Sequence, residues 1–309
     1  MVWDVLGLGA VAVDDLFYVE RYPPVDSKTP VLASQRQGGG LAGTALVTVA
    51  RLEARAAYCG VLGDDELSHF TRQELERHGV DCSPCLYQAG ARPVYAIAIV
   101  ERLTGARTLF YDRSGFIEPP VEWITPALLA SCRVLFVDHT VMGAALHAAR
   151  LAHSLGIPVV ADIEPGADER RQALLAMIDH LVIGIELGHE LTSQSDPAEM
   201  VAALAAGPHA AVVVTAGAQG CWYAAHAGPV RHCPAIQVQV VDTVGCGDVF
   251  HGAYAASLAR GEGLDRAVKI ATITAGLKTT RPGGRAGIPS WTAVEKLMQD
   301  HPDRDHSGR

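Results

Sequence analysis

Residues 241–250 read Val-Asp-Thr-Val-Gly-Cys-Gly-Asp-Val-Phe, and this stretch decides how the chain is interpreted. It follows an alternating run at 236–240 that predicts a strand. From Phe250 onward, the positions i+3, i+4, i+7 and i+8 lie on one face of an expected helix. Gly245 and Gly247 therefore lie where a strand turns into a helix. Because a helix start has free N–H groups and a partial positive charge, this turn suits an anion such as phosphate.

Asp248 adds a carboxylate to the same helix start. For binding alone, a carboxylate beside an anion site is an odd pairing, but it makes sense if it takes a proton from an attacking hydroxyl group. A lone Gly-x-Gly-Asp often marks no more than a helix cap. The longer string Asp-Thr-x-Gly-x-Gly-Asp-x-Phe, placed between a strand and a helix, favours the catalytic interpretation.

This string resembles the signature of the PfkB, or ribokinase-like, carbohydrate kinases. The resemblance implies that Asp248 is the catalytic base and that the amides of Gly245, Cys246 and Gly247 form the anion hole for the transferred phosphoryl group. Alanine is usual at the position of Cys246, and both residues are small. The resemblance also implies an α/β fold of the ribokinase type, in which a central, mainly parallel sheet has helices on both faces and a small β-sheet lid.

The order of the expected elements agrees with such a fold. Short aliphatic strands are expected at 134–137, 158–163, 181–183 and 211–215, separated by helices such as 144–155 and 170–178. This alternation predicts a parallel sheet covered by helices on both faces. Before it, the pattern predicts strands at 2–8 and 56–62 and helices at 42–52 and 66–77.

Composition limits the class of protein. With 309 residues, 49% of them hydrophobic, the chain can bury a sizeable core, and we expect one domain over 1–300 with a frayed tail at 301–309. Seven cysteines without framework spacing indicate reduced thiols in a cytoplasmic protein. A formal charge of −9 argues against nucleic acid as a partner, and no apolar run reaches the length of a membrane span.

Two early blocks, about 12–38 and 90–116, do not fit the alternation and look like extended, partly polar β structure. Within the second block, 94–100 and 107–111 alternate around 103–105, which predicts a hairpin. The resemblance implies that the two blocks form a lid that covers the sugar and pairs two subunits. We therefore expect a homodimer that associates through the lid.

Residues 38–45 read Gly-Gly-Gly-Leu-Ala-Gly-Thr-Ala and match the family signature Gly-Gly-x-x-Ala-Asn-x-Ala. The match implies that the backbone at Gly39 and Gly40 approaches the sugar hydroxyls. Gly43 stands where the family commonly has asparagine, so a side-chain amide that could bond a sugar hydroxyl is missing, and the consequence is left open. Asp14 falls at a Gly-x-x-x-x-Asp position, where a carboxylate accepts hydrogen bonds from sugar hydroxyls.

Lys28 and Arg113 lie in the expected lid blocks, where either could meet an anionic substituent of the sugar. A lone cation in a lid is more often simply solvated. Residues 248–252 and 278–289 together are similar to a family branch that includes sulfofructose kinases, and the layout at 22–24 and 34–36 is similar to ketohexokinases. We therefore expect a ketose or a related furanose as the acceptor, without choosing one sugar.

Residues 215–220 read Thr-Ala-Gly-Ala-Gln-Gly after an expected strand. Alone this is a turn signal, but the pattern Thr-x-Gly-x-x-Gly resembles the family's nucleotide loop. No Gly-x-x-x-x-Gly-Lys-Ser/Thr string occurs, so a P-loop kinase is not indicated. The resemblance implies contacts with ATP from Thr215, Gly217, Gly220, Asp242, Thr243 and Gly284.

Carboxylates at the ends of parallel strands face the ligand crevice of an open α/β sheet. Residues 162–164 read Asp-Ile-Glu at one such end and could hold Mg²⁺ through water. The family often shows Asn-x-x-Glu one strand later, but residues 184–187 read Gly-Ile-Glu-Leu and do not preserve it. We expect ATP and Mg²⁺, with Glu164 slightly favoured over Glu186 as the metal residue, and leave a monovalent cation such as K⁺ open.

Residues 7–12 read Gly-Leu-Gly-Ala-Val-Ala and satisfy the dinucleotide pattern G-x-G-x-x-A, which would suggest an NAD-dependent enzyme. That fingerprint requires a helix after the glycines, and the following residues predict none. The sequence therefore predicts an ATP-dependent sugar kinase that phosphorylates a primary hydroxyl, with Asp248 as general base. Two alternatives stay open: a nucleoside kinase of the same fold, and a non-catalytic sugar sensor, which would have no need of Asp248.

Overall fold

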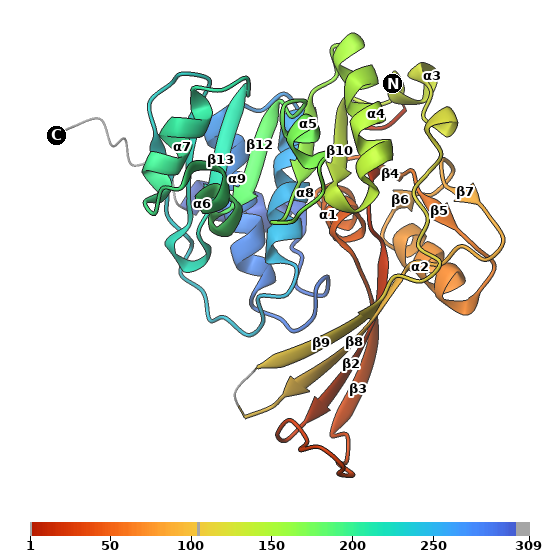
Figure 1. The fold of residues 1–309 in the computed structure, drawn as a ribbon. Helices are drawn as coiled ribbons and strands as arrows, with labels where there is room; N and C mark the ends of the chain where they lie inside the picture. The colour runs from red at the N-terminus through yellow and green to blue at the C-terminus, as the bar shows by residue number, and fades with distance from the viewer. Residues whose placement is uncertain (1, 104–105, 301–309) are drawn as a thin grey trace.

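The computed structural model describes residues 2–103 and 106–300, and its largest element is a nine-stranded sheet (Figure 1). The strand order is β15-β14-β13-β12-β11-β10-β1-β4-β6, and every neighbouring pair from β13 to β6 is parallel. Only β14 and β15, at one edge, pair antiparallel. The strands are β1 (Val5–Leu8), β4 (Ala56–Tyr58), β6 (Val80–Asp81), β10 (Val134–Asp138), β11 (Val159–Asp162), β12 (His180–Gly184), β13 (Ala211–Thr215), β14 (Cys221–Ala225) and β15 (Arg231–Cys233).

Helices cover both faces of this sheet, because successive strand residues point to opposite sides. Val160 packs into one core cluster and Ala161 into the other. The first cluster includes side chains of α1 (Leu41–Arg51), α2 (Glu66–Arg77), α8 (Cys246–Ala259), α9 (Leu264–Lys278) and α10 (Trp291–Asp300). The second includes those of α3 (Pro126–Leu129), α4 (Met142–Ser154), α5 (Arg171–Leu175), α6 (Ile185–Thr192) and α7 (Pro197–Ala205). The predicted α/β architecture is confirmed.

A separate four-stranded sheet extends from the body and is seen in the lower part of Figure 1. Its order is β3-β2-β8-β9, with bounds Ala33–Gly39, Ala12–Val19, Val94–Glu101 and Arg107–Asp112. The two predicted lid blocks therefore pair with each other. β8 and β9 pair antiparallel as the predicted hairpin requires, although the turn at 104–105 lies outside the described residues. A further small sheet joins β5 (Val61–Leu62) and β7 (Leu86–Tyr87).

The strand predicted at 236–240 is wrong, because these residues join no sheet. Their alternation comes from one-sided burial, in which Ile236 packs where Gly276 of α9 has no side chain. The backbone just beyond pairs with the end of α9 instead, since the amides of Val241 and Asp242 donate to the Thr279 carbonyl at 2.8 and 3.0 Å. An alternating pattern reports burial on one side, and it does not require a hydrogen-bonded neighbour.

Two other predicted elements are divided or shortened. The strand expected at 56–62 is split into β4 and β5, which belong to different sheets. The helix expected at 170–178 is only the five-residue α5. After Gly7–Ala12 the chain enters strand β2. The dinucleotide fingerprint requires a helix directly after its glycines, so the interpretation as an NAD-dependent enzyme is excluded.

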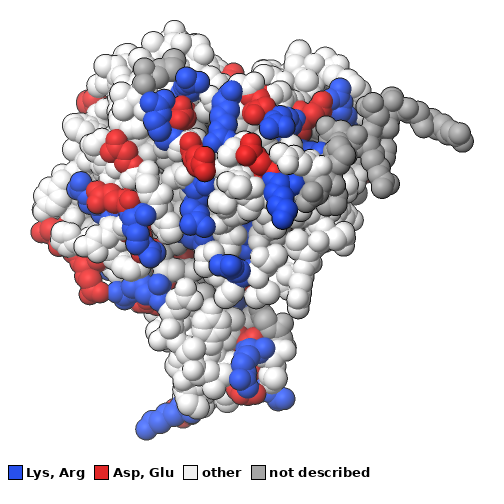
Figure 2. Space-filling view, turned by 180° about the vertical axis from the view of Figure 1, so that it is seen from behind, with Lys and Arg blue, Asp and Glu red and all other residues white. Residues whose placement is uncertain are grey.

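Charged side chains of both signs are interspersed on the face shown in Figure 2. Among residues 2–103 and 106–300, no helix combines the length and the apolar character needed to cross a bilayer. The predicted frayed tail, 301–309, lies outside the described residues.

Candidate active site

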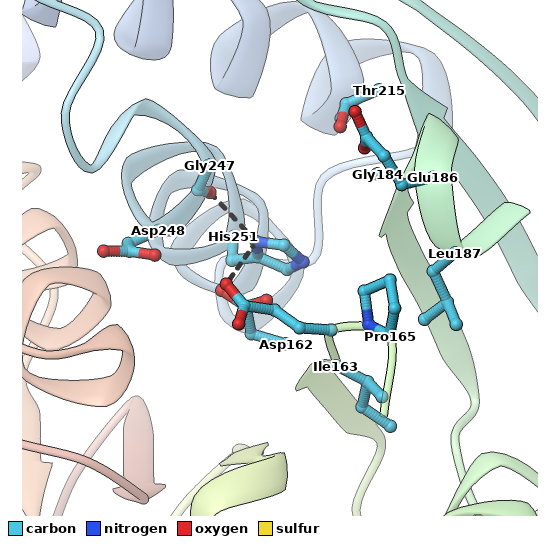
Figure 3. Close-up of a pocket in the computed structure, with 11 residues that line it drawn as sticks. Asp162, Ile163, Pro165, Gly184, Glu186, Leu187, Thr215, Gly247, Asp248 and His251 are labelled. Atoms are coloured by element: carbon cyan, nitrogen blue, oxygen red, sulfur yellow. Dashed lines mark hydrogen bonds and ion pairs between the residues drawn. The ribbon is translucent and has the colours of Figure 1, made fainter. Parts of the chain in front are cut away.

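A pocket of about 380 Å³ lies where β11, β12 and β13 end and α8 begins (Figure 3). The carboxyl ends of parallel strands meet at one edge of a sheet, and ligands of open α/β sheets bind there. Five of the predicted site residues line it together: Glu164, Glu186, Thr215, Gly247 and Asp248. The other lining residues are Asp162, Ile163, Pro165, Gly184, Leu187 and His251.

The start of α8 leaves backbone donors free beside the pocket. Gly245 precedes the helix with φ 70°, a left-handed conformation that glycine adopts without strain. No side chain caps the helix. Within the described part of the chain, the amides of Gly245 and Asp248 have no hydrogen-bond acceptor, and the Gly247 amide faces only the weakly accepting Cys246 sulfur. The Cys246 amide donates to the Thr243 carbonyl at 3.2 Å. Free amides at a helix start form a site for an anion.

Asp248 and Asp162 both line the pocket, and their carboxyl groups are close enough to affect each other's charge. Burial raises the pKa of Asp248 well above its usual value, and the nearby Asp162 acts in the same direction. Burial likewise raises the pKa of Asp162. A carboxyl group with a raised pKa holds a proton more tightly, which suits a general base working near neutral pH.

His251, one turn further along α8, fixes this helix start against the sheet. Its Nε2 lies 2.8 Å from the Val182 carbonyl oxygen, and its Nδ1 lies 2.9 Å from the Gly247 carbonyl oxygen and 3.3 Å from Asp162. Figure 3 shows the side chains of Asp162, Asp248 and His251 at one end of the pocket and those of Glu186 and Thr215 at the other. The ring therefore links α8 to both β11 and β12.

Asp242 braces the turn before α8. Its Oδ1 accepts from the Val244 amide at 2.8 Å and its Oδ2 from the Gly283 amide at 2.7 Å. The buried Lys278 donates from Nζ to the Asp242 carbonyl at 3.1 Å. Both carboxylate oxygens thus have backbone partners. Thr243 is exposed next to this brace.

Of the residues predicted to bind nucleotide, Thr215 ends β13 and lines the pocket. Gly217 and Gly220 flank the turn that follows, with φ 55° and 88°, and do not line the pocket. Gly284 lies against the anion turn, because a Cβ on Gly245 would be 3.3 Å from the Gly284 carbonyl oxygen. The Gly284 amide also donates to Oε1 of Gln37 in the lid at 3.2 Å.

The predicted acceptor residues gather where the lid joins the body. Asp14 of β2 is mostly buried, and burial raises its pKa, while the charge of Arg285 and a hydrogen bond from Gln37 oppose that rise. A side chain on Gly39 would collide with the Asp14 carboxylate. Gly40 has φ 85°, and a Cβ there would lie 2.5 Å from the Ala10 carbonyl oxygen. Gly40 therefore has no room for a side chain against the backbone, and a side chain at Gly39 would displace the Asp14 carboxylate.

Lys28 and Arg113, the two cations predicted to meet the sugar, do not lie beside the other predicted acceptor residues. Lys28 is exposed in the loop between β2 and β3. Arg113 is also exposed, donates to the Thr140 carbonyl at 3.3 Å and lies over the Phe116 ring at 5.3 Å. Neither lines the pocket. Their assignment to substrate stays a prediction without a geometric argument in its favour.

Sequence patterns did not single out Asp138, although it joins three segments below the acceptor region. This fully buried carboxylate accepts from the amides of Ala10, Ala42 and Thr140 at 2.7, 3.2 and 2.8 Å, and also from the Thr140 hydroxyl. The sequence did hold one indication of its importance: Asp138 ends strand β10, and the carboxyl ends of parallel strands face the ligand site of an open α/β sheet.

Carboxylates suited to Mg²⁺ also face the pocket. Glu164 and Glu186 line it from the ends of β11 and β12, and the Glu164 side chain is 64% exposed. Within the described ranges, no three side chains of the metal-binding types are arranged to hold an ion directly. Since Mg²⁺ keeps much of its water shell, two carboxylates near a phosphate site are adequate.

Comparison with known proteins agrees with this geometry. The family described as "pfkB family carbohydrate kinase" matches residues 5–291. Fructokinase-1 of Oryza sativa subsp. japonica is 29% identical over 288 residues, which cover 84% of this chain and 88% of that protein. Ribokinase of Bacillus subtilis (strain 168) is 25% identical over 303 residues, which cover 94% of this chain and 98% of that protein.

Solved structures share the fold at lower identity. Arabidopsis thaliana ribokinase, complexed with ribose and ATP, has a TM-score of 0.85 and 19% identity, covering 97% of this chain and 99% of that chain. An Escherichia coli protein solved with ATP and Mg²⁺ has a TM-score of 0.82 and 20% identity, covering 97% of this chain and 100% of that chain.

Proposed function

The chain belongs to the pfkB family of carbohydrate kinases, and from that premise we propose that it transfers the γ-phosphate of ATP to a primary hydroxyl group of a ketose or a related furanose sugar. It is a phosphotransferase with an alcohol group as acceptor. One observation carries the proposal: the unpartnered amides at the start of α8 and the carboxylate of Asp248 meet in one pocket.

In the proposed reaction, Asp248 accepts the proton of the attacking hydroxyl as its oxygen approaches the γ-phosphorus. The amides of Gly245, Gly247 and Asp248 donate to the oxygens of the transferred group, where negative charge gathers. Donors fixed in advance stabilise that charge without reorganising during the reaction. The Cys246 amide can join them only by giving up its bond to Thr243.

ATP would lie along the loop that begins at Thr215 and beside Gly284, with its phosphates toward α8. Glu164 and Glu186 would hold Mg²⁺ through water, and the ion would neutralise charge on the phosphate oxygens. The sugar would lie between Asp14, Gly39, Gly40 and the lid. Support comes from the similar proteins, a fructokinase and ribokinases, and from the ribose and ATP in the Arabidopsis complex.

A screen for ADP release tests the proposed function and its alternatives. The purified protein, ATP and Mg²⁺ are offered ketoses, phosphosugars, sulfosugars, deoxy sugar acids and nucleosides. We expect turnover with a ketose or another furanose sugar. Turnover with nucleosides alone would show the nucleoside kinase, and binding of a sugar without any turnover would show the sensor.

The pH profile of the reaction tests the environment of Asp248. The base works only when it is ionised, and its pKa is raised by burial and by Asp162. We therefore expect kcat/KM to fall, as the pH is lowered, through an apparent pKa above the ordinary aspartate value of about 3.9. Rates measured from pH 4 to 9 check this. An acid limb at or below the ordinary value would contradict it.

The lid surface supports the expectation of a homodimer. Leu109, Phe110 and Tyr111 of β9 are 56%, 53% and 69% exposed, and β9 is an edge strand. Leu109 and Tyr111 point to one face of the strand and Phe110 to the other, and an exposed apolar edge strand is a surface on which another chain can pair. We expect wild-type protein to elute as a dimer and Phe110→Glu as a monomer in size-exclusion chromatography. Leu155→Glu, at the end of α4, is the control and should elute like wild type; an unchanged elution of Phe110→Glu would contradict the proposed surface.

A further inference from the structure

Arg285 is a buried cation in the loop between α9 and α10, with only 7% of its surface exposed. Its Nε donates to the Thr44 hydroxyl at 3.3 Å, and its Nη2 donates to the Gly39 carbonyl at 2.7 Å. Burial lowers its pKa to about 10, so the guanidinium remains charged at neutral pH. A buried charge is costly unless it is paired and hydrogen-bonded, which calls for an explanation of its presence.

The guanidinium occupies space that two glycines leave free. A Cβ on Gly43 would lie 2.5 Å from Nη2, and a Cβ on Gly38 would collide with Nη1. Neither glycine has a positive φ, so the backbone does not require glycine at either position. The requirement is spatial, and it comes chiefly from Arg285. The Arg285 guanidinium thus occupies the space that a side chain at residue 43 would fill.

Opposite charge connects Arg285 to the acceptor region. Among the charged groups that favour its protonated form, Asp14 has the largest effect, followed by Glu74 and Asp248. The same loop reaches the lid a second time, where the Gly284 amide donates to Gln37, the residue paired with Asp14 across β2 and β3. The loop therefore holds β3 and the Asp14 carboxylate in a fixed relation to the anion turn at Gly245.

We propose that Arg285 is the positioning residue of the acceptor site: it fills the place of a residue 43 side chain and, through its bond to the Gly39 carbonyl, holds β3 beside the Asp14 carboxylate. The inference rests on the proposed function and deepens it.

Kinetics of Arg285→Gln and Arg285→Lys test the positioning role. Loss of a charge-assisted interaction should raise the KM for the acceptor roughly 10- to 100-fold, while the KM for ATP changes by less than about threefold. Arg285→Lys keeps the charge and should recover part of the loss. Arg72→Gln, which removes an exposed arginine paired with Glu76, is the control and should match wild type. An unchanged acceptor KM, or equal increases for both substrates, would overturn the proposal.

Thermal unfolding tests the shared space without any substrate. Gly43→Ala should lower Tm by at least about 2 °C in the wild-type background, because the new methyl group meets the guanidinium. In the Arg285→Gln background the same change should cost less or nothing. Gly166→Ala, where a Cβ would meet no atom within 4 Å, is the control. Equal losses in both backgrounds would overturn the packing argument.

The two proposals fail in different ways. Absence of turnover by wild type with every acceptor refutes the proposed function and, with it, the acceptor role of Arg285. Wild-type turnover with an unchanged acceptor KM in Arg285→Gln refutes the role of Arg285 alone.

Discussion

Asp248→Asn is expected to lower kcat roughly 10²- to 10⁴-fold, the range that general base catalysis contributes. The amide cannot take the proton from the attacking hydroxyl, yet it has nearly the shape of the carboxyl group. The change also removes a negative charge that would lie beside the buried Asp162. The fold and the binding of ATP should therefore remain, and only turnover should be lost.

Steady-state kinetics with the acceptor found in the screen, together with ATP binding by calorimetry, check this expectation. Asp196→Asn is the matched control. Asp196 caps α7 by accepting from the Ala198 amide at 2.7 Å, and asparagine caps helices about as well as aspartate. The control should keep wild-type kcat. Turnover of Asp248→Asn within about threefold of wild type would remove Asp248 from the role of base.

Gly245→Ala is expected to lower kcat about 10²- to 10³-fold, the typical effect of losing a donor from an oxyanion-type site. Gly245 has φ 70°, and a side chain in that conformation costs about 1–2 kcal/mol. The added Cβ would also lie 3.3 Å from the Gly284 carbonyl oxygen. To relieve the strain, the turn must shift and carry its amides away from the phosphoryl group.

A control variant at a second glycine with a left-handed backbone distinguishes an effect on catalysis from an effect of backbone strain. Gly261, after α8, has φ 80°, and a Cβ there would meet no atom within 4 Å. Gly261→Ala should therefore lower Tm by a similar amount and leave kcat unchanged. Equal kcat for the two variants would show that the amides at Gly245 do not act on the transferred group.

The local sequence was sufficient to predict those elements whose residue pattern is compatible with only one type of secondary structure. The aliphatic segments that became β10 to β13 are strands with buried centres between helices, and such runs form parallel sheets. The turn before α8 was also readable, because its glycines and its helix start are adjacent in the chain. At 236–240 the same logic failed, since one-sided packing against α9 produces the alternation of a strand without a partner strand.

The membership of the site could be predicted only in part. Thr215, Gly247, Asp248, Glu164 and Glu186 were brought to one pocket as expected, because strand ends and helix starts converge in this architecture. Lys28 and Arg113 remained outside it, since a charge in a lid block carries no information on where its side chain points. Asp138 was missed because the amides that donate to it come from three separate segments.

The sequence by itself determined the turn into a helix at 241–250 and the chemical groups that it holds, because neighbours in the chain stay neighbours in space. Tertiary structure alone decided that Asp162 and Asp248 line the same pocket and that Arg285 packs beside Gly43. Those residues are far apart along the chain, and only the parallel crossovers and the packing of the last loop bring them together. Burial, which no local pattern records, raises the pKa values of Asp162 and Asp248. It also places the Arg285 side chain where residue 43 has none.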